Sequence, residues 1–136
     1  LLADGLDMVA KHVRQIPSVA IDLVEVNDKP MTIIYPDAVT GRYGLAASTV
    51  AEDGSVGIRI PQMDYCRDLI RKFGRPIVST SANISGEPNP RCFAEISQEI
   101  IRGADFVSDS SLEKFSCGKP SSIIKINLDS TFKIIR

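Results

Sequence analysis

The distribution of apolar and polar residues along the chain predicts alternating helices and strands. Apolar residues recur at helical spacing over about 5–15 and again over 17–26, where Pro17 suits the first turn. A β-rich run follows at 31–35. Residues 36–54 contain several glycines and little periodicity, so we expect them to form mainly a loop.

The middle of the chain predicts a strand, a helix and another strand. Residues 56–60 alternate as in a strand, and 63–73 have the spacing of a helix that Gly74 ends. A short apolar run then begins at Pro76 and predicts a strand over 76–80. This order is typical of a right-handed crossover between two parallel strands.

The last third of the chain predicts a further helix and a β-hairpin. We expect the helix at 93–101, a short strand at 105–108 and a serine-rich loop at 109–120. Two β-rich runs, 122–127 and 131–136, surround a turn and favour a hairpin. Together these elements predict an α/β fold with a twisted, mixed β-sheet flanked by helices, in a single domain.

Length and composition narrow the class of protein. The 136 residues are enough for one domain with its own core, and 43% apolar with 24% charged residues is typical of a soluble globular protein. A net charge of −1 gives no overall positive field for nucleic acids, although a local basic patch stays open. No apolar run approaches the ~20 residues that span a bilayer, so we expect no membrane segment.

The cysteines are few and widely spaced. Cys66, Cys92 and Cys117 have no metal-binding spacing, and their odd number argues against a disulfide framework. We therefore expect reduced thiols, no metal ligands and a cytoplasmic location.

Side chains for nucleophilic catalysis are not evident in the sequence. His12 is the only histidine, and the Gly-x-Ser-x-Gly, Walker and dinucleotide-binding patterns are absent. We therefore expect no catalytic nucleophile, which leaves the polar residues at strand ends as candidates for a ligand site.

Polar side chains gather directly after the strand predicted at 76–80. Short donors and acceptors at a strand end lie where open α/β sheets bind ligands. Together with the loop amides beside them they can converge on an anion. The segment therefore predicts a ligand site. Its hydroxyl and amide residues are Ser79, Thr80, Ser81 and Asn83.

Arg59 lies inside the otherwise apolar run at 56–60 and permits two interpretations. Alternation alone allows it to face solvent on a half-exposed strand. Alternatively, a guanidinium in a covered strand could hold a ligand carboxylate through two parallel hydrogen bonds, because a buried charge is costly unless it is paired. The residues by themselves leave both interpretations open.

Three segments share their order and spacing with one protein family. They read Gly-Ile-Arg-Ile-Pro at 57–61, Pro-Ile-Val-Ser-Thr-Ser-Ala-Asn-Ile-Ser-Gly at 76–86 and Pro-Ser-Ser-Ile-Ile at 120–124. From about residue 16 to its C-terminus the chain resembles the YrdC-like family, whose best-known members are L-threonylcarbamoyladenylate synthases. The Lys-Pro-Met-Thr-Ile-Ile run at 29–34 is also similar to a strand of that family.

The resemblance implies an enzyme that needs no nucleophilic side chain. Such synthases, which are nucleotidyltransferases, combine L-threonine, bicarbonate and ATP, with Mg²⁺, into threonylcarbamoyl-AMP and pyrophosphate. The product serves the threonylcarbamoyl modification of adenosine in certain tRNAs, which implies a tRNA-modifying transferase complex downstream. The protein's task would be to position the reactants and to stabilise phosphate charge.

The same resemblance assigns residues to two ligands. Those expected to bind threonine are Arg59, through the threonine carboxylate, Ser79 and Ser121. Those expected to line the ATP side are Ser55, Ser81, Asn83, Asn89 and Arg136.

The sequence departs from the family pattern toward its N-terminus. No lysine here is followed by x-Arg, the cationic pair that the family places upstream, and Tyr35-Pro36-Asp37 matches the family's Tyr-Pro-Thr-Asp-Thr strand poorly. We therefore expect residues 1–136 to be the C-terminal two-thirds of a YrdC-like domain. Much of the positive charge with which the family binds the nucleotide would then be missing from this chain.

Two other functions are compatible with the resemblance. One is a non-catalytic RNA-binding or ribosome-associated protein, for which tRNA or double-stranded RNA would be the partner. The other is a carbamoyl-transfer domain of a larger maturation protein, although this chain has no neighbouring zinc-finger cysteines.

Overall fold

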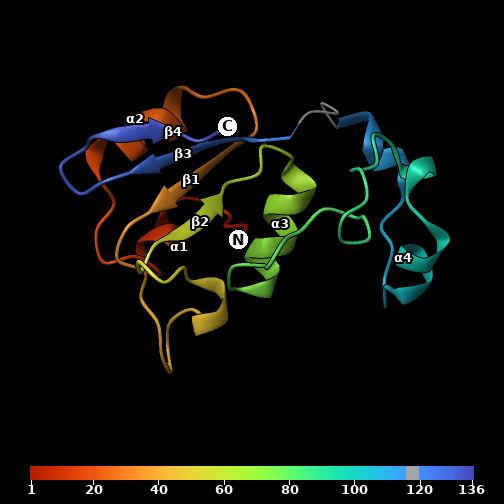
Figure 1. Cartoon of the computed structure of the whole chain (residues 1–136), viewed down its shortest axis with the longest axis horizontal. Coiled ribbons are helices and arrows are strands. Elements are labelled where there is room, and N and C mark those ends of the chain that lie inside the picture. Colours follow the sequence, from red (N-terminus) through yellow and green to blue (C-terminus); the bar gives the residue numbers. More distant parts are fainter. Residues whose placement is uncertain (116–119) are drawn as a thin grey trace. The chain divides into compact units, whose positions relative to one another are not determined.

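The computed structural model of the protein describes residues 1–115 and 120–136. The chain forms two compact units. Unit 1 comprises Leu1–Ser79 and Ser121–Arg136, and it contains the four-stranded sheet (Figure 1). Unit 2 comprises Thr80–Pro120 and contains helix α4 (Figure 1).

The sheet of unit 1 is mixed and open. It runs in the order β2-β1-β3-β4, with β1 antiparallel to β2 and parallel to β3, and β4 returns antiparallel beside β3. The predicted α/β fold with a mixed sheet and the predicted C-terminal hairpin are therefore confirmed. The strands are β1 (Met31–Tyr35), β2 (Val56–Arg59), β3 (Ser122–Ile126) and β4 (Phe132–Ile134).

The first residues of the chain extend this sheet beyond β2. Leu2 bridges Arg59 in the parallel sense and Ile77 in the antiparallel sense, and its N–H donates to Ile77 O over 2.8 Å. The segment at 76–80 therefore runs antiparallel to β2 and forms a single bridge instead of a strand. The predicted strand and the predicted parallel crossover are wrong, because the residues around Leu2 occupy the place beside β2.

Three helices of unit 1 supply apolar side chains to the core. Gly74 ends α3 with a φ of 80°, as expected of a glycine cap. Helix α1 is shorter than the predicted 5–15, because the backbone leaves the helix to form a bridge between Val13 and Ala38. The helices are α1 (Leu6–Ala10), α2 (Ser18–Val26) and α3 (Asp64–Phe73), and a short turn η1 (Ala47–Thr49) lies in the loop before β2.

Unit 2 contains short helical segments and no strand among its described residues. The helix predicted at 93–101 is divided in two, because Ile96 and Ser97 adopt an extended backbone. Ser97 then caps α4 by accepting a hydrogen bond from the N–H of Ile100 over 3.3 Å. The strand predicted at 105–108 does not form. The segments are η2 (Phe93–Glu95), α4 (Gln98–Gly103) and η3 (Ser110–Phe115).

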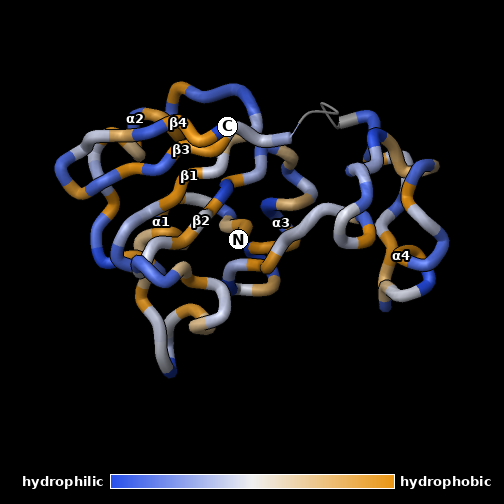
Figure 2. Tube along the Cα trace, viewed as in Figure 1, coloured by the Kyte–Doolittle hydropathy of each residue, from blue (hydrophilic) through white to orange (hydrophobic). Residues whose placement is uncertain are grey.

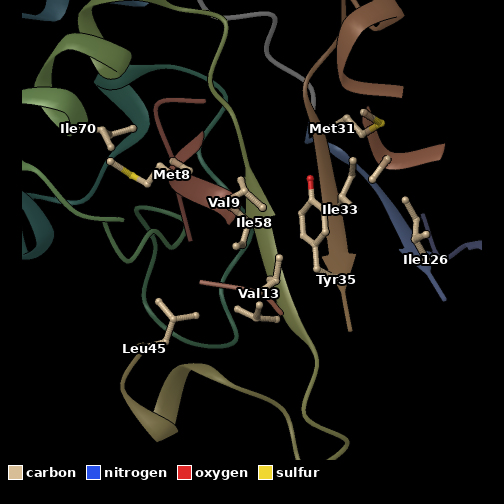
Figure 3. Close-up of a cluster of buried hydrophobic side chains, with 13 residues drawn as sticks. Met8, Val9, Val13, Met31, Ile33, Tyr35, Leu45, Ile58, Ile70 and Ile126 are labelled. Atoms are coloured by element: carbon tan, nitrogen blue, oxygen red, sulfur yellow. The ribbon is translucent and has the colours of Figure 1, made fainter. Parts of the chain in front are cut away.

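The two sides of the sheet differ. Met31, Ile33 and Tyr35 alternate into the core with Val56 and Ile58, and none of them is more than 8% exposed. Figure 3 shows strand residues of this core beside side chains from α1 and α3. Figure 2 shows the apolar stretches along the strands, whereas the turn between β3 and β4 is hydrophilic. The opposite side, here named the open face, carries Thr32, Ile34, Gly57 and Arg59.

Candidate functional site

Thr32 and Arg59 lie directly opposite one another on the open face, in the antiparallel pair of β1 and β2. The main-chain N–H of Arg59 donates to Leu1 O, and its C=O accepts from the N–H of Ala3, so neither bonds to β1. The pair is therefore of the non-hydrogen-bonded kind, in which facing side chains approach most closely.

Ser121, the residue directly before β3, joins this pair. Its Oγ lies 2.9 Å from Oγ1 of Thr32, which is hydrogen-bonding distance. The structure thus brings Arg59 and Ser121, two of the residues predicted to bind threonine, to either side of Thr32. The sequence predicted no role for Thr32. Its signals are that it is the one small polar residue in the apolar run at 31–35, and that this run is similar to a strand of the family.

One nitrogen of the Arg59 side chain is buried without a partner in the described part of the chain. This nitrogen is Nε, which is shielded from solvent. A buried donor without an acceptor costs about 1–3 kcal/mol, and more when the group is charged. Solvent does not reach this nitrogen, although the residue as a whole is partly exposed. A ligand carboxylate would supply two acceptor oxygens to the guanidinium.

Ser79 lies two residues beyond the bridge between Ile77 and Leu2, and its side chain is exposed. Leu2 also bridges Arg59, so the chain arrives at Ser79 from the β2 end of the sheet. Within the described residues no hydrogen bond links Ser79 to Arg59 or Ser121. Its role in threonine binding stays a prediction.

Ser55 is held by Asp53 in the turn before β2. Ser55 is 6% exposed, and its Oγ and N–H donate to Oδ1 of Asp53 over 2.6 and 3.0 Å. The other oxygen of Asp53 accepts from Nζ of Lys125. These bonds, first that from Lys125 and then those from Ser55, hold the pKa of Asp53 well below its usual value. Because its proton is engaged by Asp53, the Ser55 hydroxyl can only accept further hydrogen bonds in this arrangement.

The C-terminal hairpin contributes further cations. Nε and Nη2 of Arg136, a residue predicted to bind ATP, donate to the main-chain oxygen of Ser121 over 3.3 and 3.2 Å. Lys125 and Lys133 face each other across β3 and β4, and Lys125 shares the open face because it pairs with Ile34. The two lysines were not predicted, since a net charge of −1 does not reveal which cations lie together.

Three residues predicted to bind ATP, Ser81, Asn83 and Asn89, belong to unit 2. Nδ2 of Asn83 donates to the main-chain oxygens of Ile84 and Glu87, each over 3.0 Å, and so shapes the loop that contains them. Oδ1 of Asn83 is buried without a described partner, whereas Ser81 and Asn89 are exposed. The ATP contacts of these residues stay predictions.

A cavity of about 640 Å³ opens on the core side of the sheet in unit 1. Core residues such as Ile33 and Tyr35 form its apolar part, and its polar part includes Asp4, Arg67 and Arg71. The polar groups engage one another, since Nε of Arg67 donates to Asp4 O over 3.3 Å and Nε of Arg71 lies 3.7 Å from Oδ2 of Asp4. The residues predicted to bind threonine or ATP do not line this cavity.

Metal clusters, disulfides and membrane helices are not found among the described residues. No group of three or more histidine, cysteine, aspartate or glutamate side chains is suited to hold a metal ion there. Cys66 and Cys92 are free thiols, and Cys117 lies outside the described residues. No described helix has both the length and the apolar character needed to cross a membrane.

Comparison with protein families gives one match over the whole chain. The model of the Sua5/YciO/YrdC family, which carries the description "Telomere recombination", matches residues 1–136. No solved structure matches the chain at a significant level.

Curated relatives carry the name threonylcarbamoyl-AMP synthase. A protein of Methanocaldococcus jannaschii, given that name provisionally, is 42% identical over 111 residues, which cover 77% of this chain and 45% of that protein. A protein of Idiomarina loihiensis is 27% identical over 113 residues, covering 79% of this chain and 61% of its own length. A protein of Sodalis glossinidius is 32% identical over 117 residues, which cover 80% of this chain and 60% of that protein. The chain thus spans about half to three-fifths of the length of these relatives.

Proposed function

Because the chain belongs to the Sua5/YciO/YrdC family, we propose that it carries the threonine-binding side of a threonylcarbamoyl-AMP synthase. The family match and the names of the relatives support the reaction class. One observation carries the ligand assignment: Arg59, whose Nε has no described partner, lies opposite Thr32, which in turn contacts Ser121.

In this proposal Arg59 binds the carboxylate of L-threonine through two parallel N–H groups, and Ser121 and Ser79 complete the contacts. The threonine amino group and bicarbonate form a carbamate with loss of water. A carbamate oxygen then attacks the α-phosphorus of ATP, and pyrophosphate leaves. Since the substrates supply every reacting atom, the contribution of this chain is to hold and orient them.

The ATP contacts that we propose are those that the family resemblance implies. Ser55, whose proton is engaged by Asp53, would accept from a ribose hydroxyl or the adenine amino group instead of donating to a phosphate. Mg²⁺ would be held mainly by the phosphates and by water, because the described residues contain no metal cluster. The proposed ATP contacts are Ser55, Ser81, Asn83, Asn89 and Arg136.

The product of this reaction is a mixed anhydride, which reacts readily with nucleophiles. A tRNA-modifying transferase complex in the cytoplasm would use it to modify adenosine. The synthase proposal does not require this chain to bind tRNA or double-stranded RNA itself. A gel shift with a salt titration would detect such binding, because phosphate contacts weaken as salt rises.

Titration calorimetry of the 136-residue chain tests the ligand assignment. We expect weak L-threonine binding that Arg59→Gln abolishes, and negligible ATP binding because the chain has no Lys-x-Arg pair. Arg14→Gln, which changes an exposed arginine of the same unit, is the matched control and should leave binding unchanged. Tight ATP binding, or no threonine binding at all, would contradict the assignment.

The reaction itself is tested on the full-length protein. We expect ATP and bicarbonate to yield pyrophosphate only when L-threonine is present, with threonylcarbamoyl-AMP as the second product. Pyrophosphate release that does not depend on threonine would overturn the synthase proposal.

A further inference from the structure

Thr32 lies on the open face, with Arg59 opposite it in β2 and the hydroxyl of Ser121 within hydrogen-bonding distance. Its Oγ1 is 2.9 Å from Oγ of Ser121. On its β3 side the register pairs it with the apolar Ile123.

What each neighbour can accept limits the direction of the hydrogen bond. A hydroxyl has one proton to donate, an arginine side chain has only donors, and isoleucine has neither donors nor acceptors. Of these neighbours, Oγ of Ser121 is therefore the only one able to accept the Thr32 proton. Either oxygen of this pair can be the donor; when Thr32 donates, the Ser121 proton is free to point elsewhere.

We propose that Thr32 is a positioning residue that directs the Ser121 hydroxyl proton toward the ligand carboxylate held by Arg59. This inference rests on the proposed threonine site. A carboxylate oxygen is an acceptor, so it would receive the Ser121 proton and the Arg59 N–H groups together. Hydrogen bonds in such a chain polarise and strengthen one another.

The role of Thr32 distinguishes a carboxylate from its amide. L-threoninamide keeps the amino group and side chain of L-threonine but replaces the anionic oxygen with an NH₂ donor. Arg59 and the Ser121 proton are both donors in this arrangement, so they would favour the acid over the amide. Without the Thr32 hydroxyl, Ser121 is free to turn its own proton to water, and part of that preference disappears.

Calorimetry of the full 136-residue chain tests this with L-threonine and L-threoninamide. Thr32→Val is nearly isosteric and removes the hydroxyl; a lost neutral hydrogen bond predicts ~3–10-fold weaker threonine binding. Binding of the amide should change little. Thr32→Ser, which restores the hydroxyl, should recover most of the threonine affinity.

A double-mutant cycle with Ser121→Ala shows whether Thr32 acts through Ser121. We expect Thr32→Val to have little effect once Ser121 is alanine, because the proton it directs is gone. If Thr32→Val does not fold, as judged by its thermal unfolding, the Ser121→Ala and Thr32→Ser variants still test the inference.

The outcomes separate this inference from the proposed function. If the wild-type chain does not distinguish threonine from its amide, the carboxylate site fails and Thr32 has no role there. If the wild type binds threonine but Thr32→Val weakens acid and amide equally, or adds fully to Ser121→Ala, the positioning role alone is overturned.

Discussion

Lys125 in β3 donates a hydrogen bond to Asp53 in the turn before β2, across a separation of 72 positions in the sequence. The same carboxylate accepts from the hydroxyl and the N–H of Ser55. The Asp53 side chain therefore connects the hairpin to the turn before β2, and it holds Ser55, which is expected to contact ATP.

Asp53→Asn should remove a pH-dependent part of the stability. The hydrogen bond from Lys125 and those from Ser55 lower the pKa of Asp53 in the native state. A carboxyl whose pKa is lowered in the native state binds fewer protons in the folded protein than in the unfolded one. It therefore stabilises the native state fully above the unfolded pKa of about 4, and this contribution shrinks as the pH falls below that value. Urea unfolding of both proteins from about pH 6 to about pH 2 should show the advantage of the wild type shrinking. An advantage that does not vary with pH would contradict this assignment.

Tyr35 should give the opposite pH dependence. Burial raises the pKa of its phenol to about 12, whereas an unfolded tyrosine ionises near pH 10. Between these values the native state keeps a proton that the unfolded state loses, so the stability contributed by the neutral phenol falls as pH rises.

Tyr35→Phe removes this titration, and its stability relative to the wild type should rise from about pH 10 to about pH 12. Urea midpoints of the two proteins measure the change. Tyr43→Phe is the matched control for loss of a hydroxyl, because Tyr43 is 86% exposed. A Tyr35→Phe difference that is flat over this interval would show that the phenol is not protected by burial.

Gly44 should not tolerate a side chain. A Cβ at this position would lie 2.3 Å from the main-chain oxygen of Val39, which accepts the N–H of Leu45. We expect Gly44→Ala to cost about 1–3 kcal/mol of unfolding free energy, as for overpacked sites. Gly5→Ala is the control, because a Cβ there meets no atom within 4 Å. Equal thermal stability of the two variants would refute the predicted clash.

Elements that follow from local pattern were predictable, and β1 is the clearest case. Its alternation puts Met31, Ile33 and Tyr35 on one side, and the predicted run agrees with the strand. The strand predicted at 76–80 failed because an apolar run does not identify its neighbour. That neighbour is Leu2, whose place beside β2 is a contact between distant parts of the chain.

The candidate site was predictable where residue identity carried the signal. Arg59 and Ser121 were expected from the family resemblance, and the structure connects them through Thr32. The proposed role of Thr32 depends on strand register, and the placement of Asp53 depends on a long-range hydrogen bond from Lys125. Neither is visible in a linear pattern. A register shift of one residue would turn Thr32 to the other side of the sheet, and Asp53 and Lys125 are 72 positions apart in the sequence.

The geometry of the Arg59 guanidinium, beyond its charge, should determine threonine affinity. Arg59→Lys keeps the cation but replaces a planar fork of donors with a single ammonium, which cannot form two parallel bonds to a carboxylate. We expect calorimetry to show ~10-fold or greater loss of L-threonine affinity, since a hydrogen bond to a charged group contributes about 1.5–3 kcal/mol. Arg14→Lys, at an exposed position of unit 1, should retain wild-type affinity. If Arg59→Lys binds threonine as tightly as the wild type, the site needs only a positive charge, and paired binding of the carboxylate by Arg59 is wrong.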